Sequence, residues 1–332
     1  METQTPLISF IVPYHNEPFT FLKTCLDSIL ACQLDAWTRE VIVVDDGSDI
    51  SPAPWIDENY GTWVKTLRQP QGGQSTARNA GMDVATGTYI QFVDADDRLE
   101  PEVYNLCIDT IRQYSADMVC FGHRMVLDGQ QVSAKARRRV KLYNCYSGAN
   151  LMAYYNIQGA SWWFVFRRAA CGDLRFTPGI IHEDEEFTAR LLLRVQSVFY
   201  LRGEAYVYTR RAHSTITSTH SEQVERRMNC KFYVINSLAD TLATLQNDLQ
   251  RKALQRRIDQ MSMDYMVDAL RTHVPGMAGK AVANLRMIGL FPLRPKKYTM
   301  TYLAFALLTR SKICRKLLEK WSMGNCHLSI IL

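Results

Sequence analysis

The chain has 332 residues, 47% of them hydrophobic and 22% charged. This composition excludes an intrinsically disordered protein and allows one large α/β domain with a smaller appendage. The net charge of +6 suits a phosphorylated substrate or an acidic membrane surface. It does not indicate nucleic acid as a partner, because no long basic block with interleaved aromatic residues occurs.

Cysteine usage and hydropathy indicate the cellular compartment. The nine cysteines are scattered without a C-x-x-C pair, which is typical of a reducing environment rather than of a disulfide framework or a zinc site. No stretch approaches the ~20 apolar residues of a spanning helix, and the first residues lack a signal-peptide pattern. We therefore expect a cytoplasmic protein that contacts the inner face of a membrane, if any, only peripherally.

Strand-like and helix-like patterns alternate over the first 125 residues. Short apolar runs predict buried strands, and apolar residues at helical spacing predict helices. The predicted strands are 7–12, 40–44, 64–67, 88–93 and 118–121, and the predicted helices are 21–30 and 101–114. This alternation implies an α/β fold of Rossmann-like type, with a mostly parallel sheet flanked by helices.

The pattern is less regular after residue 125. The pair Asp128-Gly129 predicts a hairpin turn, because Asp-Gly readily adopts the positive φ of a tight turn. Helices are predicted at 148–155 and 183–194, and short strands at 197–201 and 205–208.

The sequence changes character near residue 220. No Gly or Pro occurs between Gly203 and Pro275, and apolar residues recur at helical spacing: Val234, Leu238, Leu242, Leu245 and Leu249. We therefore expect an α/β domain at 1–219 and an α-helical region at 220–332, which we interpret as a packing unit without chemistry. Within it, Lys and Arg residues flank the apolar segment 298–308, which predicts peripheral contact with a bilayer.

Polar residues gather where the predicted strands end, and ligands of parallel α/β sheets bind outside the carboxyl ends of the strands. The clusters are Pro13-Tyr14-His15-Asn16-Glu17, Asp45-Asp46-Gly47-Ser48 and Asp94-Ala95-Asp96-Asp97, with the helix-opening stretch Gly72–Gly81 between the last two. Folding alone does not require acids at successive buried strand ends. We therefore interpret these clusters as a functional site.

The cluster at residues 94–97 points to a metal ion. Asp94, Asp96 and Asp97 repel one another on a tight turn and are stabilised most when a divalent cation lies among them. Oxygen ligands of this type suit Mg²⁺ or Mn²⁺, which usually keeps water and substrate phosphates as its other ligands. The cluster therefore implies a diphosphate substrate, whose departure the metal would assist.

Three other residues each allow two interpretations. Asp45 either caps a turn or belongs to the site. Asp46 either does the same or accepts hydrogen bonds from a base N–H or a ribose hydroxyl. Arg78, near a helix N-terminus, either contacts a phosphate or a pyrimidine or forms an ion pair on the surface.

A fifth cluster, His182-Glu183-Asp184-Glu185-Glu186, opens a predicted helix. It is not a zinc signature, because H-E-x-x-H would require His at position 186. Acids at this position either stabilise the helix through its dipole or provide one carboxylate that deprotonates a substrate hydroxyl.

Together these residues resemble the inverting glycosyltransferase family 2, which has the GT-A fold. Five ordered motifs carry the resemblance over residues 6–215: Ile11–Glu17 (V-P-x-Y-N), Val43–Ser48 (D-D-G-S), Gly73–Gly81 (G-x-S-x-A-R-N-x-G), Tyr89–Leu99 (F-x-D-x-D-D), and Glu183, Asp184 and Phe187 (E-D-x-x-F). His15 departs from the family pattern, in which Tyr is commoner, and this touches the edge of the nucleotide pocket.

The resemblance implies roles for individual residues. Asp184 would be the catalytic base, and Asp96 and Asp97 would lie near the Mn²⁺ or Mg²⁺ and the diphosphate. The other residues expected to bind substrate are Pro13, His15, Asn16, Glu17, Asp45, Asp46, Arg78, Asp94, Ala95, Trp163, Glu183 and His213.

The implied activity is metal-dependent hexosyl transfer. A hexose or N-acetylhexosamine would pass from a nucleotide sugar, by family habit a UDP-sugar, to a hydroxyl of a saccharide or a lipid-linked acceptor in cell-surface polysaccharide synthesis. Asp184 would remove the hydroxyl proton, and a single displacement through an oxocarbenium-like transition state would invert the anomeric configuration.

Weaker hints and rival functions stay open. Trp162 and Trp163 either stack on a sugar or belong to the core, and Arg210, Arg211, His213 and Ser214 follow a predicted strand and are able to reach the diphosphate. The chain could instead be a sugar-binding protein without catalysis, although the acids would then be needless. A nicotinamide-dependent dehydrogenase is disfavoured, because Pro13–Glu17 occupies the place of G-x-G-x-x-G and no P-loop occurs.

Overall fold

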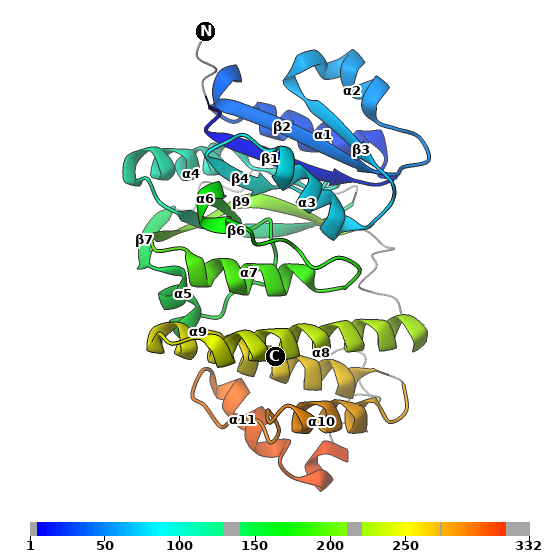
Figure 1. Cartoon of the computed structure of the whole chain (residues 1–332), viewed down its shortest axis with the longest axis vertical. Coiled ribbons are helices and arrows are strands. Elements are labelled where there is room, and N and C mark those ends of the chain that lie inside the picture. The colour runs from blue at the N-terminus through cyan, green and yellow to red at the C-terminus, as the bar shows by residue number, and fades with distance from the viewer. Residues whose placement is uncertain (1–4, 129–139, 211–220, 273, 317–332) are drawn as a thin grey trace. The chain divides into compact units, whose positions relative to one another are not determined.

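A nine-stranded sheet organises the first part of the chain in the computed structural model, which describes residues 5–128, 140–210, 221–272 and 274–316 (Figure 1). Its strands are β1 (Ile8–Tyr14), β2 (Arg39–Asp46), β3 (Lys65–Gln69), β4 (Tyr89–Phe92), β5 (Arg98–Leu99), β6 (Met118–Leu127), β7 (Lys141–Tyr146), β8 (Phe164–Arg167) and β9 (Val198–Arg210). The strand order is β3-β2-β1-β4-β8-β6-β9-β5, and β7 pairs with β9.

The sheet is mixed rather than mostly parallel. Strand β1 runs parallel to β2 and β4, and β2 runs parallel to β3. Strand β8 is antiparallel to both of its neighbours, β4 and β6, and β5 and β7 are antiparallel to β9. Strands β6 and β9 pair in parallel. The parallel prediction therefore holds within the strands of the first 92 residues, where every residue of β1 is buried, and for the pair of β6 and β9.

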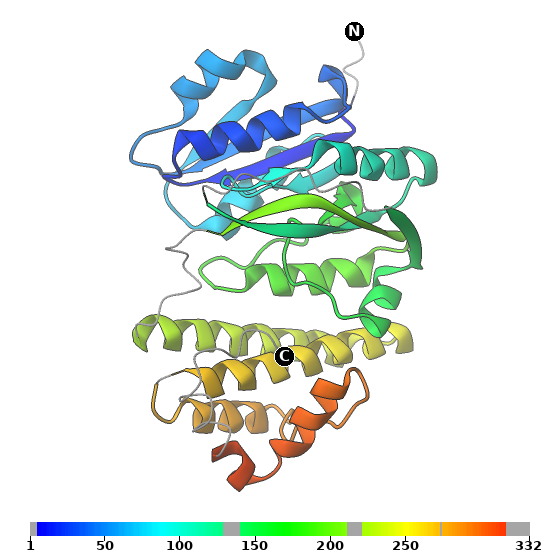
Figure 2. The same cartoon turned by 180° about the vertical axis from the view of Figure 1, so that it is seen from behind.

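Helices cover both faces of this sheet, and in Figures 1 and 2 α1 and α2 lie above it and α7 below it. The helices of this part are α1 (Phe19–Leu30), α2 (Ala53–Tyr60), α3 (Gln74–Val84), α4 (Pro101–Tyr114), α5 (Gly148–Tyr154), α6 (Arg168–Cys171) and α7 (Glu183–Arg194), with 3₁₀ turns at Ala36–Thr38 and Gly61–Trp63. Helix α4 has the predicted bounds, because Pro101 fits its first turn and Ser115 ends it in the left-handed region (φ 50°).

One predicted feature near the end of this part is wrong. The two short strands at 197–201 and 205–208 form the single strand β9. Strand β9 does not turn at Gly203. Its pairing with β6 is irregular there, because the register shifts at Gly122, and the strand then continues. Strand β6 extends to Leu127 and Asp128 lies in a turn. Gly129 lies outside the described residues, so the hairpin turn at 126–129 stays a prediction.

The chain divides into two compact units, Met1–Leu151 with Gln158–Ala212, and Met152–Ile157 with His213–Leu332. The second unit contains α8 (Ser221–Thr244), α9 (Asp248–Arg271), α10 (Met277–Met287) and α11 (Met300–Leu308). The predicted α/β fold with a C-terminal helical region is thus confirmed. The boundary at residue 220 stays a prediction, since residues 211–220 lie outside the described part.

The first two helices of the second unit are separate, although one apolar repeat runs through both in the sequence. Helix α8 ends at Thr244, and the side chain of Asn247 accepts a hydrogen bond from the Gln250 N–H (3.0 Å) to cap α9. None of the described helices is long and apolar enough to cross a membrane.

Candidate active site

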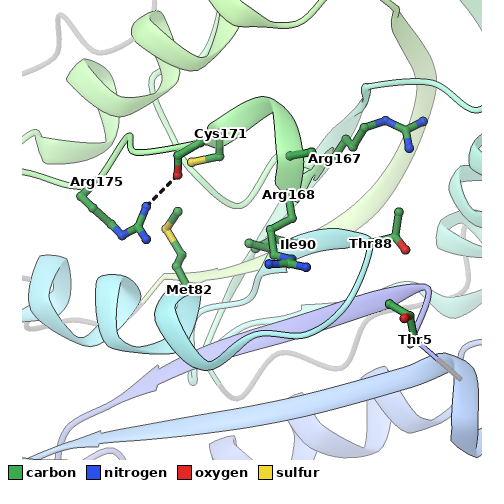
Figure 3. Close-up of a pocket in the computed structure, with 10 residues that line it drawn as sticks. Thr5, Met82, Thr88, Ile90, Arg167, Arg168, Cys171 and Arg175 are labelled. Atoms are coloured by element: carbon green, nitrogen blue, oxygen red, sulfur yellow. Dashed lines mark hydrogen bonds between the residues drawn. The ribbon is translucent and has the colours of Figure 1, made fainter. Parts of the chain in front are cut away.

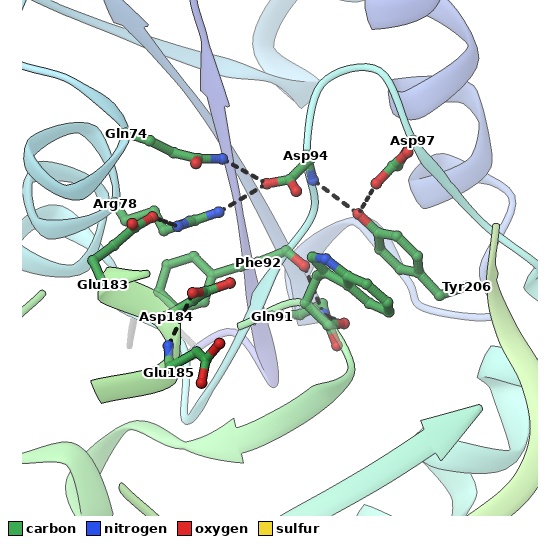
Figure 4. Close-up of polar contacts among 11 residues, drawn as sticks. Gln74, Arg78, Gln91, Phe92, Asp94, Asp97, Glu183, Asp184, Glu185 and Tyr206 are labelled. Atoms are coloured by element: carbon green, nitrogen blue, oxygen red, sulfur yellow. Dashed lines mark hydrogen bonds and ion pairs between the residues drawn. The ribbon is translucent and has the colours of Figure 1, made fainter. Parts of the chain in front are cut away.

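The sheet brings four of the predicted polar clusters to one edge. Strands β1, β2 and β4 are parallel, so their carboxyl ends at Tyr14, Asp46 and Phe92 point the same way. Asp94 follows β4, and α3 begins beside it at Gln74. Figure 4 shows Arg78 between Asp94 and Glu183 of α7, and Asp184 follows Glu183 in the same helix.

Asp46 holds the loop that opens α3. Its buried carboxylate accepts hydrogen bonds from the N–H groups of Gly72 (2.9 Å) and Gly73 (2.7 Å) and from the side-chain amide of Gln69 (2.7 Å). Gly73 has φ 90°, which favours glycine. In this geometry Asp46 orders the Gly-Gly turn. Its contact with a base or a ribose stays a prediction.

Asp45 has the geometry of a turn cap, which is one of the two interpretations that the sequence allowed. It is fully buried, accepts from the Ser48 N–H (2.9 Å) and pairs with Arg68 (2.6 Å). Burial acts to raise its pKa, but hydrogen bonds from Ser48 and Ser51 and the charge of Arg68 lower the pKa overall. The turn between Asp45 and Ser48 requires glycine at position 47. Gly47 has φ 69°, and an added Cβ would lie 2.6 Å from the backbone nitrogen of Gln71.

The end of β1 is joined to the same turn by His15 and Asn16. His15 Nδ1 lies 2.8 Å from the carbonyl oxygen of Asp46, and its Nε2 lies 3.2 Å from the amide nitrogen of Gln71. The tautomer with its proton on Nδ1 fits both contacts. The side chain of Asn16 exchanges hydrogen bonds with Asp49 (2.9 and 3.2 Å).

The other two residues of this cluster have separate positions. Glu17 accepts a hydrogen bond from the N–H of His15 (2.7 Å), and Pro13 is buried within β1. The structure therefore brings His15, Asn16 and Glu17 together with Asp46, as the motif order implies.

Arg78 is the residue that connects three of the motifs. It is 2% exposed, and its guanidinium donates to Glu183 Oε1 (2.9 Å) and to Asp94 Oδ1 (3.1 Å) (Figure 4). The guanidinium also lies over the ring of Phe176, 5.3 Å from its centroid. Burial acts to lower its pKa, but Asp94, Glu183 and Asp184 raise the pKa overall, so the arginine stays charged. Arg78 thus forms ion pairs, as one alternative predicted, but they are buried rather than on the surface. Contact with a phosphate or a pyrimidine stays a prediction.

The turn after β4 is held by Tyr206, which the sequence analysis did not identify. Its hydroxyl donates to Asp97 Oδ2 (2.9 Å) and accepts from the Asp94 N–H (3.1 Å). The other oxygen of Asp97 accepts from the Thr209 N–H (2.7 Å), and Ala95 is buried. Asp94 and Asp96 are only partly buried, so the turn offers these two carboxylates outward and uses Asp97 inward.

The charge on this turn fits a bound cation. Burial, together with the carboxylates of Asp94 and Asp96, raises the pKa of Asp97 well above its usual range. Among the described residues no group of three His, Cys, Asp or Glu side chains is arranged to hold a metal ion. One or two carboxylates suffice for Mg²⁺-type ions when substrate phosphates supply further ligands.

Asp184 opens α7 beside Arg78 and is partly exposed. Its Oδ1 accepts a hydrogen bond from the Glu185 N–H (2.9 Å). Burial and the neighbouring charges of Glu183 and Glu185 raise its pKa well above that of an ordinary aspartate, although Arg78 acts in the opposite direction. A carboxylate with a raised pKa is suited to accept a proton near neutral pH.

The tryptophan pair belongs largely to the core. Trp162 stacks on Tyr206 with ring centroids 4.4 Å apart, and Trp163 is 5% exposed. The structure therefore favours the packing alternative for both residues. His213, Arg211 and Ser214 lie outside the described residues, and Arg210 ends β9.

Two further residues that position the site were missed in the sequence. Gln91 is fully buried and donates to the Trp162 carbonyl (3.0 Å), and it accepts from Tyr104 (3.1 Å). Asn79 exchanges two hydrogen bonds with the backbone of Phe176 (both 2.9 Å), which leads into α7. The sequence signal for Gln91 was a polar residue inside the otherwise apolar strand YIQF. Asn79 had no such signal apart from its place in the Gly73–Gly81 motif.

A separate hollow of about 380 Å³ lies at the other end of β4 (Figure 3). Its lining includes Thr88, Ile90 and three arginines but none of the predicted site residues. Arg167 already pairs with Asp117 (3.0 Å) and Arg175 with Asp83 (2.7 Å). Asp94 follows the opposite end of the strand, so this hollow is not part of the acidic site.

A sheet with acids at the ends of β2 and β4, faced by an acid-opened helix, is the arrangement of a GT-A glycosyltransferase. The family model described as glycosyl transferase family 2 matches residues 9–175. The chain belongs to this family, and its activity is the transfer of a sugar.

Relatives and solved structures agree with this family. The chain is 28% identical over 253 residues to the uncharacterized glycosyltransferase YibD of Escherichia coli K12, covering 71% of this chain and 70% of the relative. It is 37% identical over 121 residues to the uncharacterized glycosyltransferase EpsJ of Bacillus subtilis, covering 35% and 34%. It is 34% identical over 107 residues to the hyaluronan synthase of Pasteurella multocida, of which it covers only 11%.

Among solved structures, Staphylococcus aureus TarS 1–349 in complex with UDP-GlcNAc has a TM-score of 0.66 at 18% identity, covering 96% of this chain and 92% of TarS. The mannosyltransferase PcManGT of Pyrobaculum calidifontis, in complex with GDP-Man and Mn²⁺, has a TM-score of 0.54 at 13% identity, covering 97% and 86%. These likenesses show the GT-A fold and confirm the predicted fold class.

Proposed function

We propose that the chain is an inverting glycosyltransferase that moves a hexose or N-acetylhexosamine from a UDP-sugar to a hydroxyl of a saccharide or lipid-linked acceptor, in cell-surface polysaccharide synthesis. The observation that carries the proposal is Asp184, a carboxylate of raised pKa beside the Arg78–Asp94 pair. The UDP-GlcNAc bound to TarS and the polysaccharide-synthase relatives support the donor and the pathway class.

In this proposal, Asp184 accepts the proton of the acceptor hydroxyl as the oxygen attacks the anomeric carbon. The motif at Asp45 and Asp46 shapes the nucleotide end of the site through the loop that it holds. Asp94 lies at the sugar end, where Arg78 and Gln74 (3.1 Å) fix its carboxylate. An acid on one side of the anomeric carbon and the leaving group on the other is the arrangement for a single inverting displacement.

A divalent cation fits the turn at residues 94–97. Asp96, with Asp94 beside it, would hold the ion. Asp97 was predicted as a second ligand, but its two oxygens are engaged by Tyr206 and Thr209. When bound, Mn²⁺ or Mg²⁺ supplies positive charge that stabilises the departing nucleoside diphosphate.

A donor screen tests the proposal. With Mn²⁺ and each common nucleotide sugar, we expect slow release of UDP from one UDP-sugar even without acceptor, and its loss with a chelator. Asp96→Ala should lower this release at least ~10²-fold, the scale of removing a transition-state charge partner. Nucleotide release is measured by a coupled assay.

Asp83→Ala is the matched control, because Asp83 pairs only with the exposed Arg175. It should release UDP like the wild type. Undiminished release from Asp96→Ala would contradict the metal assignment, and release only from GDP- or nucleoside monophosphate sugars would contradict the UDP assignment.

The raised pKa of Asp184 predicts a pH dependence. The base acts when deprotonated, so transfer should fall as the pH drops through a pKa that lies above the ordinary aspartate value. Glu185→Gln removes one of the charges that raise this pKa, and the acid limb of kcat/KM should therefore move to lower pH. The measurement is the pH profile of both proteins with saturating metal.

Glu102→Gln is the control, since Glu102 is an exposed acid in the first turn of α4. Its profile should match that of the wild type. An acid limb that stays in place or moves upward in Glu185→Gln would show that another group limits transfer at low pH.

A further inference from the structure

Helix α11 is apolar all round, although it lies at the surface of the second unit. The nine residues Met300–Leu308 contain no Asp, Glu, Lys or Arg. One side of the helix packs inward, where Tyr302, Phe305 and Ala306 are buried. A helix that is apolar on every side is normally enclosed by protein or by lipid, so the outer side requires an explanation.

The outer side of α11 exposes large apolar side chains. Met300 is 80% exposed, Leu307 51% and Leu308 46%. Residues seven and eight positions apart lie on the same side of a helix, so these three form one stripe opposite the buried side. Thr299 caps the helix through the Tyr302 N–H (3.0 Å), which fixes where the stripe begins.

The segment that contains this stripe carries charge of a single sign. The described residues 274–316 contain nine Lys and Arg and no Asp or Glu: Lys280, Arg286, Arg294, Lys296, Lys297, Arg310, Lys312, Arg315 and Lys316. The whole chain has 39 Lys and Arg against 33 Asp and Glu. Without these nine, acids outnumber bases by three, so the net positive charge of the protein comes from the segment that contains α11, although Lys280 is paired with Glu225.

Basic residues flank the stripe at both ends. Lys296 and Lys297 precede the helix, Arg310 follows it, and all three are exposed. At nine residues, α11 is only ~14 Å long, about half of the hydrocarbon thickness. It is therefore too short to span a bilayer and has the length and composition of a helix that lies in the interface.

We propose that the α11 patch, defined as Met300, Leu307 and Leu308 with Lys296, Lys297 and Arg310, binds the surface of an anionic bilayer. The apolar stripe would enter the boundary between headgroups and acyl chains, and the basic residues would contact the anionic headgroups. The inference does not depend on the identity of the donor or of the acceptor sugar.

A bilayer fits this patch better than another polyanion does. Nucleic acid offers phosphates to Lys and Arg but no continuous apolar layer for Met300 and Leu307. An acidic protein would need both a matching apolar surface and negative charge, whereas an anionic membrane provides both as a bulk property. Nucleic acid and acidic protein are therefore outcomes that the test must distinguish.

The test is co-sedimentation of the full chain with vesicles at low salt. We expect binding to vesicles of phosphatidylcholine with phosphatidylglycerol and at least tenfold weaker binding to phosphatidylcholine alone. Lys296→Gln, Lys297→Gln and Arg310→Gln together should weaken binding by at least ~10-fold, since each basic residue near the surface contributes measurably. Met300→Gln with Leu307→Gln should weaken it comparably, because the stripe supplies the apolar contact.

Met125→Gln with Leu127→Gln is the matched control, because these side chains are 56% and 50% exposed in the first unit. It should bind vesicles like the wild type. All variants should release UDP at the wild-type rate, so a failure here is distinct from a failure of the proposed function. Three results would overturn the proposal. The first is no binding to anionic vesicles at low salt, and the second is equal binding to neutral vesicles. The third is displacement of the protein from vesicles by DNA while the double variant Met300→Gln, Leu307→Gln still binds as the wild type does.

Discussion

Replacement of Asp184 by asparagine is expected to abolish sugar transfer while donor binding is retained. Asparagine cannot take the proton of the acceptor hydroxyl, and a positioned general base contributes ~10²–10⁴-fold to the rate. The amide oxygen can still accept from the Glu185 N–H, which Asp184 accepts at 2.9 Å, so the start of α7 should be kept. Turnover with acceptor and calorimetric titration with UDP and Mn²⁺ measure the two properties separately.

Asp173→Asn provides the control for this substitution. Asp173 pairs with Arg194, and its side chain is 92% exposed. Its transfer rate should equal that of the wild type. Normal transfer by Asp184→Asn would place the base elsewhere, and Glu183 and Glu185 would then be the next carboxylates to replace.

Replacement of Arg78 by methionine is expected to cause the largest loss of stability. Methionine fills much of the same volume over Phe176 but leaves Glu183 and Asp94 without their counter-charge. Their side chains are only 11% and 18% exposed. Removing one partner of a buried charged pair costs about 3–5 kcal/mol of unfolding free energy. Urea unfolding followed by circular dichroism measures this loss, and transfer should fall with it because α7 loses its connection to the turn after β4.

Arg175→Met tests whether the loss comes from the buried pair. Arg175 binds Asp83 at 2.7 Å, but the two side chains are 38% and 59% exposed, and a surface pair contributes only ~0–1 kcal/mol. The control should therefore unfold close to the wild-type midpoint. An equal loss in both variants would mean that the pairs of Arg78 do not stabilise the site more than a surface pair does.

The sequence alone determined the elements whose signal is local. Helix α7 has the predicted bounds, because apolar residues at helical spacing and acids in the first turn both identify it. The buried strands β1, β2 and β4 were predicted to within a few residues, because an uninterrupted apolar run followed by polar residues needs no distant partner to be recognised. The order of the motifs likewise identified the family before any contact was known.

Only the tertiary structure decided which strands are neighbours and where each polar side chain turns. Strand β8 has four residues, and nothing local shows that it enters the sheet antiparallel between β4 and β6. The carboxylates of Asp45, Asp46 and Asp97 were among those expected to bind substrate or metal, yet each accepts a hydrogen bond from a backbone N–H group of the protein. Arg78 meets Glu183, 105 positions away. Such ion pairs and hydrogen bonds depend on burial and on contacts between distant segments. Neither can be read from the local sequence pattern, because both arise only when the chain folds.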